Sequence, residues 1–339
     1  MPERAQLTQL CRQGRSGGFS LVELMVSVLL GIVLSLGIVS VYLESKRNYI
    51  AEEDTARIQE NGRFALNYLK RELMQAGFYG GKLTVNQMPS VSVGTDCVAS
   101  GNWALDANEP LEFINDYTTS LTTNKGTILN CLPAEIKSGT DIFTVKRSSG
   151  EPTLKNGVYK TGVTAATSNQ WYLKFENYGD TKSWQNGSTA ITGTEATEDS
   201  KVDFWEFYTQ VFFIRNYSIA SVDAIPTLCV ARLVGSAMAT DCLVEGVEDM
   251  QIEFGIDEDS DGTPNRFMDN PSDADITDAV VARIYLLLRG TSEIAGYTND
   301  KTYNLGQKSI TIDPDDKDRY LRRVMTTTVQ MRNATLPSL

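Results

Sequence analysis

The chain of 339 residues contains no histidine. Ser-His-Asp catalysis, Cys-His catalysis and histidine zinc sites are therefore excluded, and so is the commonest general base. The sequence also lacks a glycine-rich phosphate loop followed by Lys-Ser or Lys-Thr. Its acidic residues are scattered and form no paired-acid motif. We therefore expect a protein that is not an enzyme.

Basic residues are in the minority, with 31 Lys and Arg against 43 Asp and Glu and a formal net charge of −12. Nucleic-acid binding depends on clustered Lys and Arg, so we expect no nucleic-acid partner. The length allows one long helix together with one large or two small domains.

Charged residues and proline are both missing from Leu24 to Leu43. About 20 residues at roughly 1.5 Å rise can cross a hydrocarbon core of about 30 Å. The preceding leader carries three arginines and one glutamate, so the positive-inside rule keeps it in the cytoplasm and sends the rest of the chain outward. The sequence predicts a transmembrane helix over residues 19–43.

The junction before this helix is Arg15-Ser-Gly-Gly-Phe-Ser-Leu-Val-Glu-Leu24. An ordinary signal peptide is cleaved after its apolar stretch, whereas here the small residues precede it. A carboxylate such as Glu23 costs about 2.5–3.5 kcal/mol in a membrane segment and usually has a functional partner. The junction resembles the class III signal of type IV prepilins and type II secretion pseudopilins. The alternative is an uncleaved signal anchor.

That resemblance implies removal of residues 1–18 by a prepilin peptidase, with cleavage after Gly18 and an N-methylated Phe19 as the new terminus. It also implies that Glu23 pairs with the terminal amine of a neighbouring subunit during assembly. Removing the leader would leave a net charge of −14.

Helical signals continue beyond the apolar run, from Glu44 to Ala76. Apolar residues there recur at spacings of three, four and seven, and Gly77 supplies a stop. We expect one helix over 19–76, with an amphipathic part, residues 44–77, that docks on the head. The stripe predicted to be buried comprises Ile58, Ala65, Leu66, Leu69 and Leu73.

The segment Glu60-Asn-Gly-Arg-Phe-Ala-Leu-Asn-Tyr-Leu-Lys-Arg-Glu-Leu-Met-Gln-Ala-Gly-Phe-Tyr-Gly80 resembles the PilW family of large minor pilins. Blocks at 141–147, 243–289 and 320–333 resemble it too. The resemblance implies a minor pilin that primes type IV pilus assembly at or near the tip. Its partners would be other minor pilins, the major pilin and the inner-membrane assembly platform, in the inner membrane and pilus of a Gram-negative bacterium. Alternatives are a J-type pseudopilin and a membrane-anchored calcium-dependent binding domain.

Residues 78–339 are expected to form a β-rich head of one or two sub-lobes, because helical periodicity gives way to β-branched and aromatic runs. The fold class predicted is α+β, with the long helix packed on an antiparallel-rich head. The stretch Asn177–Ser200 is expected to be an exposed loop or hairpin. Strands are predicted at Asp141–Arg147, Trp171–Phe175, Val202–Ile214, Thr227–Val234, Met250–Ile256, Ala279–Arg289 and Tyr320–Met331.

Five cysteines are present, and Cys11 would leave with the leader. An exported chain favours disulfides among the remaining four, which allow three connectivities. The favoured pairs are Cys97–Cys131 and Cys229–Cys242, because each closes a local loop. Free buried cysteines are the alternative.

One acidic stretch, residues 257–265, resembles the start of a calcium loop, with oxygen ligands at alternate positions and Gly262 where a sharp turn is needed. Met268 stands where a bidentate glutamate is expected, so the alternative is a solvated acidic turn. The candidate Ca²⁺ ligands are Asp257, Asp259, Asp261, Thr263 and Asn265.

Overall fold

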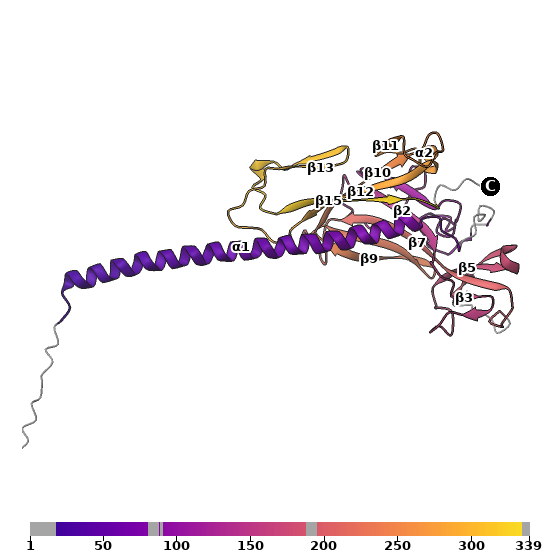
Figure 1. The fold of residues 1–339 in the computed structure, drawn as a ribbon, viewed down its shortest axis with the longest axis horizontal. Helices are drawn as coiled ribbons and strands as arrows, with labels where there is room; N and C mark the ends of the chain where they lie inside the picture. Colours follow the sequence, from indigo (N-terminus) through magenta and orange to yellow (C-terminus); the bar gives the residue numbers. More distant parts are fainter. Residues whose placement is uncertain (1–17, 81–87, 89–90, 188–194, 334–339) are drawn as a thin grey trace, which may run out of the picture. The chain divides into compact units, whose positions relative to one another are not determined.

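The computed structural model describes residues 18–80, 88, 91–187 and 195–333 (Figure 1). The chain divides into two compact units, residues 1–50 and residues 51–339. The expected leader lies outside the described residues except for Gly18. The fold is α+β, as predicted, and the second unit forms an antiparallel-rich β head with the end of the long helix packed on it.

Helix α1 extends from Leu21 to Gln75, within two residues of the expected bounds. Gly77, at φ +75°, ends it, and the Gly77 N–H bonds to the carbonyl of Lys146 in the head at 3.0 Å. All five residues of the predicted stripe are buried. Three residues that sequence periodicity did not predict are buried on the same helix: Asp54, Gly62 and Glu72.

The described part of the head contains a nine-stranded, a four-stranded and a two-stranded sheet. The 14-residue strand β7 organises the largest sheet, because it pairs with β2, β3, β5 and β8 along its length. The second sheet has the order β11-β10-β12-β15, and β13 pairs only with β14. The strand bounds are β1 Leu111–Ile114, β2 Ile142–Ser148, β3 Leu154–Lys155, β4 Val158–Tyr159, β5 Trp171–Glu176, β6 Thr181–Asn186, β7 Val202–Arg215, β8 Thr227–Val234, β9 Ala237–Glu245, β10 Val247–Ile256, β11 Arg266–Met268, β12 Ala279–Arg289, β13 Thr302–Leu305, β14 Lys308–Thr311 and β15 Arg322–Gln330. The short helices are η1 Asn177–Gly179, α2 Asp273–Thr277 and η3 Pro314–Asp316.

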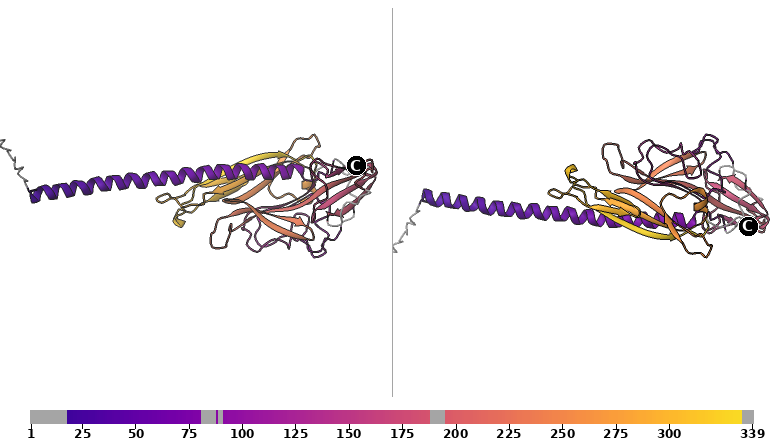
Figure 2. Two further views of the ribbon diagram at one scale, coloured as in Figure 1. Left: turned by 90° about the horizontal axis from the view of Figure 1, so that it is seen from below. Right: turned by 90° about the horizontal axis from the view of Figure 1, so that it is seen from above.

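The C-terminal part of α1 contributes to a core that both larger sheets share (Figure 2). Its apolar stripe packs with Phe143 and Phe212 of the first sheet and with Leu286 of the second. A Cβ on Gly62 would lie 2.4 Å from the sulfur of Met325, so any larger residue there would require the Met325 side chain of β15 to shift. On the other side, Asn61 donates to the carbonyl of Glu245 in β9 at 3.0 Å. The helix thus contacts both edge strands, β9 and β15.

Two disulfides join Cys97 to Cys131 and Cys229 to Cys242, the pairs favoured from the sequence. The first disulfide belongs to a second apolar core, around Trp103 and Phe213, under the long connection before β2. The second joins the neighbouring strands β8 and β9.

All seven expected strands are present, as β2, β5, β7, β8, β10, β12 and β15, with shifts of up to three residues at their ends. The stretch expected to be a loop or hairpin contains β6, which pairs with β5 as a hairpin, while residues 188–194 lie outside the described part. Strands β1, β3, β4, β9, β11, β13 and β14 were not predicted.

Candidate functional site

The first candidate site is the start of the first unit, where Gly18, Phe19 and Glu23 lie. Gly18 and Phe19 are exposed and precede α1, whose first hydrogen bond runs from the Leu24 N–H to the Ser20 carbonyl at 3.0 Å. Glu23 occupies the first helical turn, where a carboxylate interacts favourably with the helix dipole. Gly18, Phe19 and Glu23 are therefore all exposed.

The surface that follows Glu23 is apolar all round the helix. Every residue from Phe19 to Leu43 is exposed in the described structure, and the helix is long and apolar enough to cross a membrane by length and composition. Soluble proteins rarely expose a continuous apolar surface of this extent to water. The segment therefore fits membrane anchoring.

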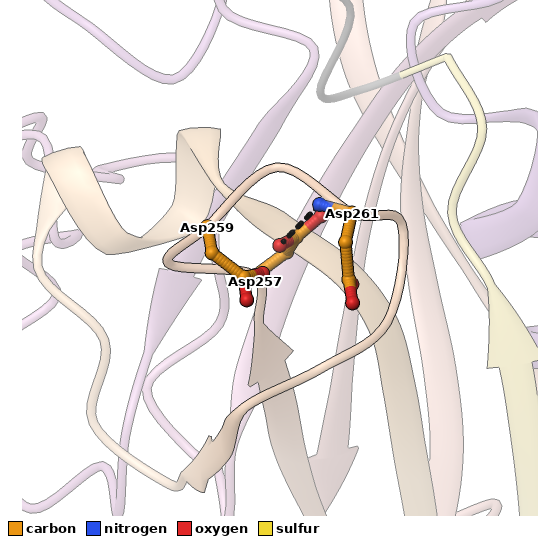
Figure 3. Close-up of side chains that lie close together, drawn as sticks. All are labelled: Asp257, Asp259 and Asp261. Carbon is orange, nitrogen blue, oxygen red and sulfur yellow. Dashed lines mark hydrogen bonds between the residues drawn. The ribbon is translucent and has the colours of Figure 1, made fainter.

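The second candidate site is the acidic loop between β10 and β11 (Figure 3). Asp257, Asp259 and Asp261 each offer one carboxylate oxygen, and these oxygens all lie within 4.8 Å of one another. Asp259 and Asp261 are exposed, whereas Asp257 is buried. Gly262 adopts φ +86°, the left-handed conformation that the sharp turn requires.

Asp257 also holds the loop together through its carboxylate. It accepts hydrogen bonds from the backbone N–H groups of Asp261 and Gly262 at 3.2 and 2.8 Å. Burial acts to raise the pKa of this carboxyl, but the donated hydrogen bonds outweigh burial, so its pKa lies below the ordinary value. The carboxylate is therefore ionised at neutral pH with or without a cation.

The side chains of the other two predicted ligands, Thr263 and Asn265, make hydrogen bonds within the loop. The Thr263 hydroxyl donates to Asp261 at 2.5 Å, and the Asn265 side-chain oxygen accepts from the Glu258 N–H at 2.6 Å. Met268 belongs to β11, so strands flank the loop where an EF-hand would have helices. The geometry brings together the three carboxylates of the candidate cation site.

Sequence reasoning missed two ionic clusters in the head, each of which contains a buried carboxylate. In one, the Lys308 ammonium of β14 contacts Asp116 at 2.8 Å and Asp249 at 3.1 Å. Asp141, next to them, accepts from the backbone N–H groups of Asp116 and Ile252. Burial raises the pKa of Asp141 and of Asp249. This cluster connects the β13–β14 hairpin to β10. No spacing of residues in the sequence predicts it.

The other cluster ties α1 to the first sheet. Arg147 of β2 donates from Nε and Nη2 to the two carboxylate oxygens of Glu72, at 2.6 and 2.9 Å. The Glu72 side chain is only 1% exposed. Its position three residues after Leu69 and one before Leu73 was a signal, because a charged residue on an apolar stripe needs a buried partner.

Comparison with known families concerns the second unit. Residues 211–333, from within β7 to just beyond β15, match the family model PilW, described as type IV pilus-assembly protein W. This part of the head is therefore similar to the PilW family of type IV pilus-assembly proteins. No curated protein and no solved structure matches it.

The PilW match and the N-terminal motif are independent observations. The matched residues exclude all of α1, so the match does not depend on the apolar segment or on Glu23. A role in type IV pilus assembly is that of a structural protein, and the apolar helix fits membrane anchoring.

Proposed function

We propose that this protein is a PilW-family minor pilin that helps to prime type IV pilus assembly and sits at or near the pilus tip. The observation that carries the proposal is the combination, in one chain, of a PilW-like head with a Gly18-Phe19 junction and Glu23 at the start of an apolar helix. Neither part alone would suffice, because an apolar N-terminal helix also occurs in simple membrane anchors.

The exposed apolar surface from Phe19 to Leu43 supports this mechanism. Before assembly, lipid of the inner membrane would cover it, with the head in the periplasm. After cleavage by the prepilin peptidase and extraction through the assembly platform, the helices of other minor pilins and of the major pilin would cover it instead. Glu23 would then neutralise the N-methylated amine of a neighbouring subunit, which relieves the cost of its charge among apolar side chains.

Two alternatives make different use of the same residues. A J-type pseudopilin of type II secretion would share the N-terminal mechanism, but the PilW match favours the pilus. A membrane-anchored calcium-dependent binding domain would use the acidic loop and would have no need of Glu23.

The proposal is tested in the native host with the full chain and three variants. Gly18→Arg should block cleavage, because it places a long side chain where the peptidase site expects none. Glu23→Ala should be inserted and processed to Phe19 but be depleted from sheared pili. Glu44→Ala is the matched control, an exposed glutamate of the same helix beyond the apolar run, and should behave as wild type.

Mass spectrometry of the mature N-terminus and quantification of the protein in sheared pili provide the two measurements. A mature terminus other than N-methylated Phe19 would contradict the processing step. Glu23→Ala recovered in pili at the wild-type level would contradict the assembly step. A wild-type protein that is absent from pili and co-purifies with a secretion apparatus would favour the pseudopilin.

A further inference from the structure

The β7–β8 loop, residues 216–226, exposes two aliphatic side chains to an unusual degree. Ile219 is 88% exposed and Val222 is 90% exposed. Every other large apolar side chain in the described part of the chain is less exposed, and this holds for the N-terminal helix as well. Single exposed apolar residues are common, but two within four positions of one loop form a local apolar tip.

The loop that carries this tip is ordered by one carboxylate. Asp223 accepts from the N–H groups of Ser218 and Ile225 at 3.0 Å each, and from those of Ile219 and Ala220 at 2.8 and 3.1 Å. These backbone bonds, led by those from Ile225 and Ser218, hold the pKa of Asp223 well below its ordinary value. The loop backbone around Ile219 is therefore already ordered in the free protein.

Contacts from neighbouring strands fix the loop from outside as well. Arg215 of β7 donates to the Tyr217 carbonyl at 2.9 Å and lies over the Tyr217 ring, 4.2 Å from its centroid. Arg289 of β12 donates to the Ala224 carbonyl at 2.7 Å. The loop is thus bound to both larger sheets.

A third attachment connects the loop to α1. The Ser218 hydroxyl donates to the Glu245 carboxylate, and the Glu245 carbonyl accepts from Asn61 of the helix. The loop therefore lies at the end of the head where the helix carries Asn61, with β9 between them. A segment fixed by so many polar contacts pays little conformational entropy on binding.

The small size of the tip indicates what kind of partner it fits. Two aliphatic side chains can cover at most a few hundred Å², whereas a stable interface buries at least about 1,200 Å². The tip cannot hold a soluble partner by itself. It can add to a complex that another interface already holds together, because tethering makes the second contact effectively intramolecular.

We propose that Ile219 and Val222 dock on an apolar depression in the head of a neighbouring pilin subunit of the same filament. This inference rests on the proposed function, since packed N-terminal helices would supply the tether. The rigid loop presents the two side chains, and their removal from water supplies the free energy of the contact.

Site-specific photo-crosslinking of the full chain in the native host tests the inference. A photoreactive residue replaces Ile219 or Val222, and the controls replace Ile128 or Val158, apolar residues that are each 53% exposed. Positions 219 and 222 should crosslink to another pilin subunit, identified by mass spectrometry, and the controls should not. A second copy of this chain, a lipid or a non-pilin protein as the product would overturn the proposal, as would equal yield at the controls.

Substitutions provide a second measurement. Ile219→Ser with Val222→Ser should lower the amount of protein in sheared pili roughly tenfold or more, since two buried aliphatic side chains are lost from the contact. Ile128→Ser with Val158→Ser should have no effect. Asp223→Ala should lower recovery with both aliphatic side chains intact, because it releases the loop backbone. An unchanged melting temperature would show that the variants fold.

The two proposals fail in different ways. If wild-type protein is recovered in pili but positions 219 and 222 give no pilin crosslink, the docking inference is wrong and the minor-pilin function stands. If wild-type protein is absent from pili, the proposed function is wrong and the docking inference falls with it.

Discussion

The ion pair between Glu72 and Arg147 provides a quantitative test of how the head holds α1. The Glu72 side chain is 1% exposed and that of Arg147 10%, and Arg147 also lies over the Tyr208 ring at 4.8 Å. Glu72→Ala leaves a guanidinium buried without its counter-charge. Removing one partner of a buried pair costs about 3–5 kcal/mol, because the other charge stays desolvated.

Replacing both partners should give a very different result. In Glu72→Leu with Arg147→Met, no charge is left buried and side chains of comparable size fill the space. Such replacements are often neutral or even stabilising by about 1–4 kcal/mol. The double variant should therefore be more stable than Glu72→Ala alone, although it carries one more substitution.

The assay is urea unfolding of a soluble fragment, residues 45–339, with the disulfides intact. Glu53→Ala is the matched control, because Glu53 pairs with Arg57 at 2.7 Å on the same helix with both side chains exposed. That loss should cost only about 0.3–0.5 kcal/mol. A cost below about 1 kcal/mol for Glu72→Ala, or a double variant less stable than the single one, would refute the reasoning.

Three further measurements follow from the structure. Non-reducing peptide mapping should find Cys97–Cys131 and Cys229–Cys242, and removing either should cost roughly 2–4 kcal/mol; four free thiols would contradict this. Burial raises the pKa of Asp54, although the Ser292 N–H bonds to it, so the folded state retains its proton to higher pH than the unfolded state and stability falls as pH rises through that interval. Asp54→Asn should therefore gain stability relative to wild type between acidic and neutral pH in urea unfolding, and a constant difference would count against the assignment. Calcium should bind the acidic loop weakly, with a Kd of about 10⁻⁴–10⁻³ M, as in extracellular calcium-binding modules. Calorimetry should show heat that Asp259→Asn abolishes and that the control Asp300→Asn, an exposed aspartate outside the loop, retains. The absence of heat at millimolar calcium would show that the loop is an acidic turn without a calcium site.

Patterns that depend on neighbours in sequence were predicted well. The buried stripe of α1 followed from spacing alone, and β2, β7, β8, β10 and β12 are long runs rich in β-branched and aromatic residues. Strand β9 was missed because its sequence, Ala-Met-Ala-Thr-Asp-Cys-Leu-Val-Glu, does not alternate between apolar and polar residues, and its pairing with β8 supplies what its own sequence does not. The short strands β13 and β14 depend in the same way on packing, here around Tyr303 and Leu305.

The same distinction, between residues that are neighbours in the sequence and residues brought together by the fold, applies to the candidate sites. Alternate spacing predicted the convergence of Asp257, Asp259 and Asp261, because a tight turn brings alternate residues to one side. It could not predict that Asn265 would bond to Glu258 instead. Lys308 meets Asp116 across 192 positions of sequence, a proximity that only the folded sheets create.

The polar contacts of α1 also explain how the head selects one placement of the helix. An apolar stripe with repeated spacings packs almost as well after a slip of one turn. Asp54, Asn61 and Glu72 bond to Ser292, Glu245 and Arg147, which come from three different parts of the head. Their spacings of 7 and 11 residues are close to two and three turns at about 3.6 residues each, so they lie along one side of the helix. A slip would break all three contacts at once and would leave the buried Arg147 without its counter-charge, so these contacts discriminate between placements that the apolar stripe alone would not distinguish.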